Sequence, residues 1–260
     1  MSVTITAVDR WRKEEIRKAV AVGIATGRLY RGMVTPGDLN SVERWVNVAL
    51  PPLLRANRAS ARSAAKFYDL LREIELAKLE IDAEPYKAEP VLKTLDGGIR
   101  YSLMTSGKTQ YTRTANSDWD PSRMNENAIA GTIIRHVLNG GRATIDRNSQ
   151  QDKAALGWVR VTDGNPCAFC AMLASRGVAY RPYRKDAFTA SNARYEGSGE
   201  AKVHNSCGCG LKPVWSLDDD VLAQNRRFES LWADMAGTTT RTAFSQFRKN
   251  YEAAGLHKHS

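Results

Sequence analysis

The sequence predicts an α+β fold that is mostly helical, and three observations support this prediction. Apolar residues recur at helical spacing through most of the first 81 residues and again after residue 121. The run GWVRV, at 157–161, is short and rich in branched and aromatic residues, as is typical of a strand. All four cysteines lie in two short motifs, NPCAFC at 165–170 and NSCGCG at 205–210. We expect a helical N-terminal arm, a small cysteine module and C-terminal helices.

Turn-forming residues divide the chain into four predicted regions. Residues 1–81 form a helical N-terminal region, in which two helices meet at Pro51 and Pro52. Residues 82–120 are rich in Gly, Pro, Ser and Thr and predict a linker or a loosely folded connection. Residues 121–215 contain the cysteine module, and residues 216–260 form C-terminal helices and a polar tail.

Helix signals refine the second half of the chain. Gly140 and Gly141 are expected to end one helix, and a second helix is expected over 142–156. Ser216 precedes three aspartates that would complement a helix dipole, so we expect it to be an N-cap. The amphipathic segment 240–255 predicts the last helix.

Composition limits the classes of partner. The chain has 260 residues and a formal net charge of +10, which favours a polyanion such as nucleic acid or an acidic protein surface, although simple solubility explains the charge equally well. No stretch approaches the roughly 20 apolar residues of a membrane helix. The N-terminal segment has charges where a signal peptide is apolar, so we expect a soluble protein in a cytoplasm.

The two cysteine motifs predict a metal site. Cys167 and Cys170 can form a knuckle that faces one ion, and His204, Cys207 and Cys209 offer further donors from a second turn. In a reducing cytoplasm such clustering favours a metal over disulfides. We therefore expect a zinc-stapled α+β module. Two disulfides formed in an oxidising medium, or four free thiols, remain the alternatives.

These five donors compete for the four places of a tetrahedral zinc site. The two knuckle cysteines and Cys207 are the first candidates, and the last place is contested between His204 and Cys209. A site closed by protein ligands holds structure and does not activate water. A zinc deaminase is excluded because no His-x-Glu or Cys-x-Glu precedes PCxxC; His136 is followed by Val137 and Leu138.

Between the two motifs, the loop interleaves tyrosines with basic residues. Such a mixture can follow a nucleic-acid backbone while its rings stack on bases. An ordinary basic loop whose tyrosines pack on the knuckles is the alternative. The candidate nucleic-acid-binding residues are Tyr180, Arg181, Tyr183, Arg184, Lys185 and Arg194.

The runs GWVRVTDGNPCAFCAMLASRG and HNSCGCGLKPVW resemble the C-terminal domain of the MuF-like phage minor head proteins. That pattern has a strand, Cys-x2-Cys, a variable loop, and His-x2-Cys-x-Cys before a strand with a proline. The resemblance is closest to the actinobacteriophage branch, through ARSAAKFYDLLRE before the module and AFSQFRKN after it. One departure is Gly208, at a position where the pattern commonly has arginine.

The resemblance implies a minor capsid or head morphogenesis protein that lies near the portal in the virion head after assembly in the host cytoplasm. Its implied partners are the portal or the major capsid protein, together with packaged DNA, and neither a membrane nor a small-molecule substrate. Members of this branch are also often labelled capsid maturation proteases. No catalytic residue is assigned, because a protease needs a nucleophile beside a histidine base and His136 lies on an apolar helix face. A free-standing nucleic-acid-binding zinc protein is the other alternative.

Overall fold

The fold is helix-rich, with one small sheet, as the sequence predicts. A computed structural model describes residues 3–35, 37–93, 96–115, 126–162, 166–178, 207–232 and 240–256. Two short strands form the sheet, and helices account for most of the remaining described chain. No described helix combines the length and the apolar character that crossing a membrane requires.

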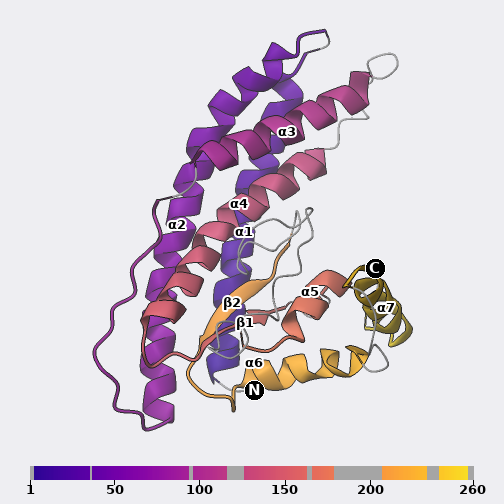
Figure 1. The fold of residues 1–260 in the computed structure, drawn as a ribbon. Coiled ribbons are helices and arrows are strands. Elements are labelled where there is room, and N and C mark those ends of the chain that lie inside the picture. The colour runs from indigo at the N-terminus through magenta and orange to yellow at the C-terminus, as the bar shows by residue number, and fades with distance from the viewer. Residues whose placement is uncertain are drawn as a thin grey trace.

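Three long helices form an elongated bundle (Figure 1). Helix α4 packs along both α1 and α2, and α3 crosses one end of the bundle. This distal end has its own apolar core, which includes Trp45, Leu53, Leu103 and Ile133. The long helices are α1 (Val3–Met33), α2 (Asn40–Lys78) and α4 (Glu126–Gln151), and the crossing helix is α3 (Asp96–Ala115).

The prediction of two helices meeting at Pro51 and Pro52 is wrong, because α2 runs through both prolines. A proline inside a helix removes the hydrogen bond to the carbonyl four residues earlier. Here those carbonyls belong to Asn47 and Val48 on the outer side of the helix, where the side chain of Val48 is 47% exposed. Water can therefore satisfy the carbonyls, and the apolar face on the other side keeps the helix continuous.

Gly140 and Gly141 do not end a helix, contrary to the prediction, since α4 passes through them. They lie where α4 meets α2: a Cβ on Gly140 would stand 2.1 Å from the carbonyl oxygen of Asn57. The amide of Asn57 also donates a hydrogen bond of 2.7 Å to the carbonyl of His136. The glycines thus allow two backbones to approach closely, which a sequence pattern cannot distinguish from a helix stop.

The predicted linker is corrected in its second half. Residues 82–93 have no helix or strand, as predicted, and run back along the outside of the bundle (Figure 1). Residues 96–115 instead form α3, whose buried side is made of Ile99, Leu103, Gln110 and Thr114 with Gly107 between them. Too few of these residues are apolar for the helical period to be visible.

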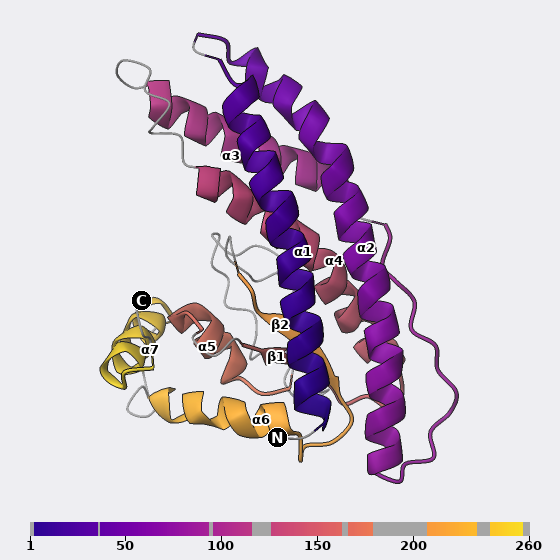
Figure 2. The ribbon, with the colours of Figure 1, turned by 180° about the vertical axis from the view of Figure 1, so that it is seen from behind.

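The cysteine module lies beside the other end of the bundle (Figure 2). Its two antiparallel strands pair Gly157 with Val214 and Val161 with Gly210, which confirms the predicted strand. The strands join the bundle through a second apolar core. The elements here are β1 (Gly157–Val161), α5 (Ala168–Ala174), β2 (Gly210–Val214), α6 (Asp220–Asn225) and α7 (Thr240–Ala253).

The last helix is confirmed as α7, whereas the N-cap predicted at Ser216 is wrong. Asp219 is the cap, because its carboxylate accepts hydrogen bonds from the backbone N–H groups of Val221 and Leu222. Ser216 instead accepts a hydrogen bond from the N–H of Asp218. The boundary predicted at residue 121 also differs from the packing, since α4 shares the cores of both regions.

Candidate metal centre

Three thiols meet in the interior of the cysteine module. Cys170 lies in the first turn of α5, whereas Cys207 and Cys209 precede β2. The three sulfur atoms all lie within 4.8 Å of one another, and those of Cys170 and Cys207 are 3.5 Å apart. All three side chains are buried. This confirms that the two cysteine motifs come together.

Cys167 adjoins this cluster. It is the N-cap of α5, and its sulfur accepts a hydrogen bond of 3.4 Å from the backbone N–H of Cys170. Its side chain packs against the three buried cysteines and is itself partly exposed. Cys167 is not among the three cysteines whose sulfurs lie within 4.8 Å of one another, so the knuckle predicted from Cys-x2-Cys stays a prediction.

Strand pairing explains why the motifs meet. Val161, the last residue of β1, lies opposite Gly210, the first residue of β2. The chain therefore leaves one strand and enters the other at the same end of the sheet. Cys167 follows β1 by a short connection and Cys209 directly precedes β2. The register therefore brings the motifs together, although Cys207 follows Cys170 by 37 positions in the chain.

His204, the fifth predicted donor, lies outside the described residues, as do all six candidate nucleic-acid-binding residues of the loop. The structure therefore assigns no contact to Tyr180, Arg181, Tyr183, Arg184, Lys185 or Arg194.

The clustered thiols favour a metal ion. None of the four cysteines, all of which lie in the described part of the chain, forms a disulfide. The hydrogen bond with Cys167 is the largest cause that raises the pKa of Cys170, and contacts with Cys207 and Cys209 and burial raise it further. The hydrogen bond from Cys170 lowers the pKa of Cys207. Without a cation the thiols share their protons, whereas a bound metal ion allows all of them to be thiolates.

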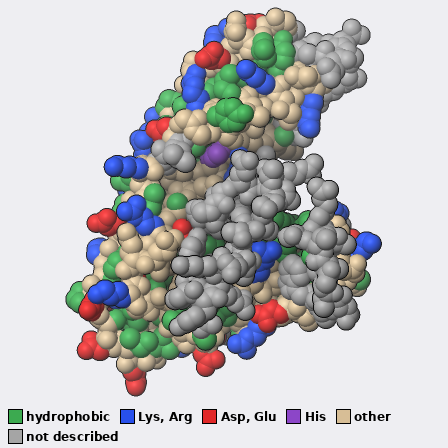
Figure 3. All heavy atoms as spheres, viewed as in Figure 1, with side chains coloured by type: hydrophobic (Ala, Val, Ile, Leu, Met, Phe, Trp, Pro, Cys, Tyr) green, Lys and Arg blue, Asp and Glu red, His purple; other side chains and the backbone are tan. Residues whose placement is uncertain are grey.

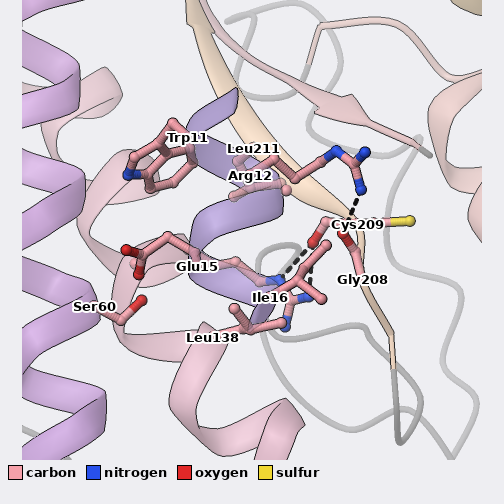
Figure 4. Close-up of a pocket in the computed structure, with 12 residues that line it drawn as sticks. Trp11, Arg12, Glu15, Ile16, Ser60, Leu138, Gly208, Cys209 and Leu211 are labelled. Carbon is pink, nitrogen blue, oxygen red and sulfur yellow. Dashed lines mark hydrogen bonds between the residues drawn. The ribbon is translucent and has the colours of Figure 1, made fainter. Parts of the chain in front are cut away.

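Arginines from two bundle helices hold the turn that carries Cys207 and Cys209. Figure 4 shows Arg12 beside Gly208 and Cys209 of this turn. Arg142 of α4 donates hydrogen bonds of 2.8 Å to the carbonyl of Cys207 and 2.6 Å to that of Cys209. Arg12 of α1 donates one of 3.4 Å to the carbonyl of Gly208. Burial lowers the pKa of Arg142, and the neighbouring thiol of Cys207 opposes that effect. Sequence analysis missed both arginines, since neither lies near a cysteine in the chain.

A small cavity of about 20 Å³ lies between this turn and the bundle, room for about one water molecule. Trp11 and Glu15 of α1, Ser60 of α2 and Leu138 of α4 contribute to its wall (Figure 4). The turn that carries Cys207 and Cys209 therefore faces α1, α2 and α4 across this cavity.

Buried ion pairs fix the far end of the module. Lys212 of β2 is almost fully buried, and its ammonium pairs with Asp219 and, at 3.5 Å, with Glu75 of α2. Arg72 of α2 pairs at 2.9 Å with the buried carboxylate of Asp152. Removing one partner of such a pair leaves a buried charge uncompensated, so these contacts hold strand, cap and bundle together.

His136 is the one histidine among the described residues, and it lies on α4 away from the cysteines. Its Nε2 is 2.8 Å from the hydroxyl of Ser102 on α3, and Arg135 donates a hydrogen bond of 3.0 Å to the same hydroxyl. Burial, with the positive charge of Arg135, lowers the pKa of His136 to about 3. The imidazole is therefore neutral at physiological pH.

Comparison with known proteins gives one family. A model described as VG15 protein matches residues 3–247, nearly the whole chain. No curated protein and no solved structure matches the chain.

Proposed function

The chain belongs to the VG15 protein family, and we propose that it is a phage minor capsid protein, a structural component of the head near the portal with a zinc centre. One observation carries the proposal: the cysteines of the two motifs that resemble the MuF-like pattern meet in one buried cluster. The protein would assemble in the host cytoplasm and remain in the virion head.

Zinc suits the donor set. Sulfur ligands in a tetrahedral arrangement are typical of structural zinc. Cys170, Cys207 and Cys209 would hold the ion, and Cys167 or His204 would take the fourth place. With protein ligands in every place the metal has no open position for a substrate or a water molecule, so it supplies stability and no catalysis.

The zinc ion would tie the knuckle at 167–170 to the turn at 207–209. Two five-residue strands, the apolar contacts of α5 and the hydrogen bonds from Arg12 and Arg142 also hold these segments. In small modules of this kind a bound metal adds to the folding energy.

The bundle offers the docking surface for portal or major capsid protein. Its three long helices extend well beyond the module, so a partner can bind the distal end without touching the cysteines (Figure 1). Basic and acidic side chains are interspersed on the face in Figure 3. That distribution favours contact with a protein, whereas DNA contact rests on the basic loop residues and on the net charge of +10.

Quantitative mass spectrometry of gradient-purified, DNA-filled particles tests the proposal. We expect the intact chain in these particles at a few to a few tens of copies per head. Absence of the chain from particles whose coat protein has been processed would overturn the structural role and favour an assembly enzyme.

One observation favours a protease as the second candidate: the contact between Ser102 and His136. A serine nucleophile needs a base that takes its proton, and a base is most effective with a pKa near the working pH. The pKa of about 3 for His136 makes it a weak base. We therefore assign this contact a packing role between α3 and α4.

The variant Ser102→Ala separates the two functions, with Ser106→Ala as the matched control. Ser106 lies on the same helix, one turn away, and its hydroxyl contacts Thr132 of α4 at 3.1 Å. Equal coat-protein cleavage in both variants is expected for a structural protein. Loss of cleavage in Ser102→Ala alone, with the chain still folded, would establish the protease.

A further inference from the structure

Arg142 has an unusual environment for a charged side chain. It is 3% exposed, and its hydrogen-bond partners among the described residues are all uncharged oxygens. They are the carbonyls of Cys207 and Cys209 and the side-chain amide of Asn139. A guanidinium keeps its charge at physiological pH, and burying it without a negative partner is costly. A source of negative charge is therefore needed close by.

Thiols are the groups that can supply this charge. The electrostatic neighbours of Arg142 include Cys207, Cys209 and Cys170, together with a second cation, the buried Arg160 of β1. Neutral thiols would leave the arginine uncompensated. A zinc ion with three thiolates and a neutral histidine has a formal charge of −1, whereas one with four thiolates has a formal charge of −2.

We propose that the centre is an all-cysteine site, with Cys167 as its fourth ligand, and that Arg142 is its buried counter-ion and positions the Cys207–Cys209 turn. This inference rests on the zinc centre proposed above and deepens it. His204 is then no ligand.

The position of Cys167 agrees with this ligand set. Its sulfur accepts the N–H of Cys170, and its side chain packs on the other three cysteines. The sulfurs of Cys170, Cys207 and Cys209 lie within 4.8 Å of one another, and Cys167 packs beside them but outside that group, so its side chain has to shift towards them to become the fourth ligand.

Cobalt substitution of the full chain tests the ligand set. Absorption from sulfur-to-cobalt charge transfer grows with the number of Co–S bonds, so Cys167→Ser should lose about a quarter of it for a four-coordinate site. His204→Ala should leave the spectrum unchanged.

The reverse result, a changed spectrum in His204→Ala and an unchanged one in Cys167→Ser, would overturn the all-cysteine site while leaving a metal centre in place. If the wild-type chain binds neither cobalt nor zinc, the proposed zinc centre itself is wrong. This result differs from the spectral changes that would disprove only the all-cysteine ligand set, so the two proposals can be tested separately.

Zinc affinity tests the role of Arg142. We expect Arg142→Met to weaken zinc binding about 10- to 100-fold in a chelator competition, as is typical when a group that orients metal ligands is lost. Arg142→Lys keeps the charge but loses the planar fork, so a smaller loss is expected.

Two matched controls lie on the same helix. Ile133→Ala removes a fully buried side chain in the distal core, and Arg147→Met removes an exposed arginine. Both should keep wild-type zinc affinity, although Ile133→Ala lowers the stability of the bundle. If Arg142→Met weakens zinc binding no more than Ile133→Ala does, Arg142 is only a packing residue and the inference is wrong.

Discussion

The distal bundle and the cysteine module are stabilised in different ways. The distal bundle buries large apolar side chains such as Trp45, Leu53 and Ile129 between long helices. The module has two five-residue strands and a short helix, and its centre consists of thiols and buried arginines. Burial of apolar side chains stabilises the fold without a ligand. A buried cation such as an arginine is stable only when a nearby negative charge, here that of thiolates, compensates it.

With the proposed zinc centre, this difference means that one chain combines an apolar scaffold with a part whose order would depend on a metal. The two parts meet at the carbonyls of Cys207 and Cys209, which Arg142 holds against α4. The bundle thus supplies the platform that holds the cysteine turn.

Zinc removal should have the largest effect, and it should destabilise the cysteine module while leaving the distal bundle folded. Cys170→Ser, or chelation of the wild type, removes binding energy on the order of 10 kcal/mol for a structural zinc site. Hydrogen exchange should then lose protection in β1, α5 and β2. The distal parts of α1, α2 and α4 should keep theirs.

Leu53→Ala is the reciprocal control, since Leu53 is fully buried in the distal core. It should lower the free energy of unfolding of the bundle by about 2–5 kcal/mol and leave zinc affinity unchanged. Equal loss of protection in both regions after zinc removal would contradict the comparison, because it would mean that they unfold as one unit.

Gly140→Ala should have an intermediate effect, which is a loss of stability of the helical bundle. Its new methyl group would overlap the Asn57 carbonyl, so α4 must move away from α2 at a cost of about 1–3 kcal/mol. Gly32→Ala is the control: it meets no atom within 4 Å and should raise stability slightly, as alanine favours a helix. Urea denaturation of both variants measures the difference, and equal midpoints would refute the close approach.

The smallest effect is expected from pH. His136 is neutral in the fold with a pKa of about 3, while an unfolded histidine has a pKa near 6.5. The unfolded chain therefore binds more protons between these values, so this stability is complete above pH 6.5 and is lost as the pH falls towards 3. At pH 5 the loss is about 1–2 kcal/mol.

His136→Gln removes the titration, so its stability should fall less than that of the wild type between pH 6.5 and pH 5. A metal bound by thiolates would be lost as they are protonated, so the comparison is made between metal-free samples. Parallel pH profiles would show that His136 is not held neutral.

Sequence analysis could predict the elements whose signal is local. The strand at 157–161, the helix at 240–253 and the meeting of the two cysteine motifs follow from spacing and composition. It could not recognise α3, because Gly107 and polar residues such as Gln110 form much of its buried side.

Residues that act across the fold escaped prediction for a related reason. Arg12 and Arg142 reach the cysteine turn from α1 and α4, and Cys209 follows Arg142 by 67 positions in the chain. In the sequence they are two among 38 basic residues. Only the packing of α4 against α2, which depends on Gly140, places Arg142 at the cysteines.

The most direct test of the account is the metal content of the purified full chain, measured by native mass spectrometry together with elemental analysis. We predict one zinc ion per wild-type chain and none in Cys170→Ser. A wild-type chain without metal, or a full zinc equivalent retained by Cys170→Ser, would contradict the cysteine centre on which the proposed function rests.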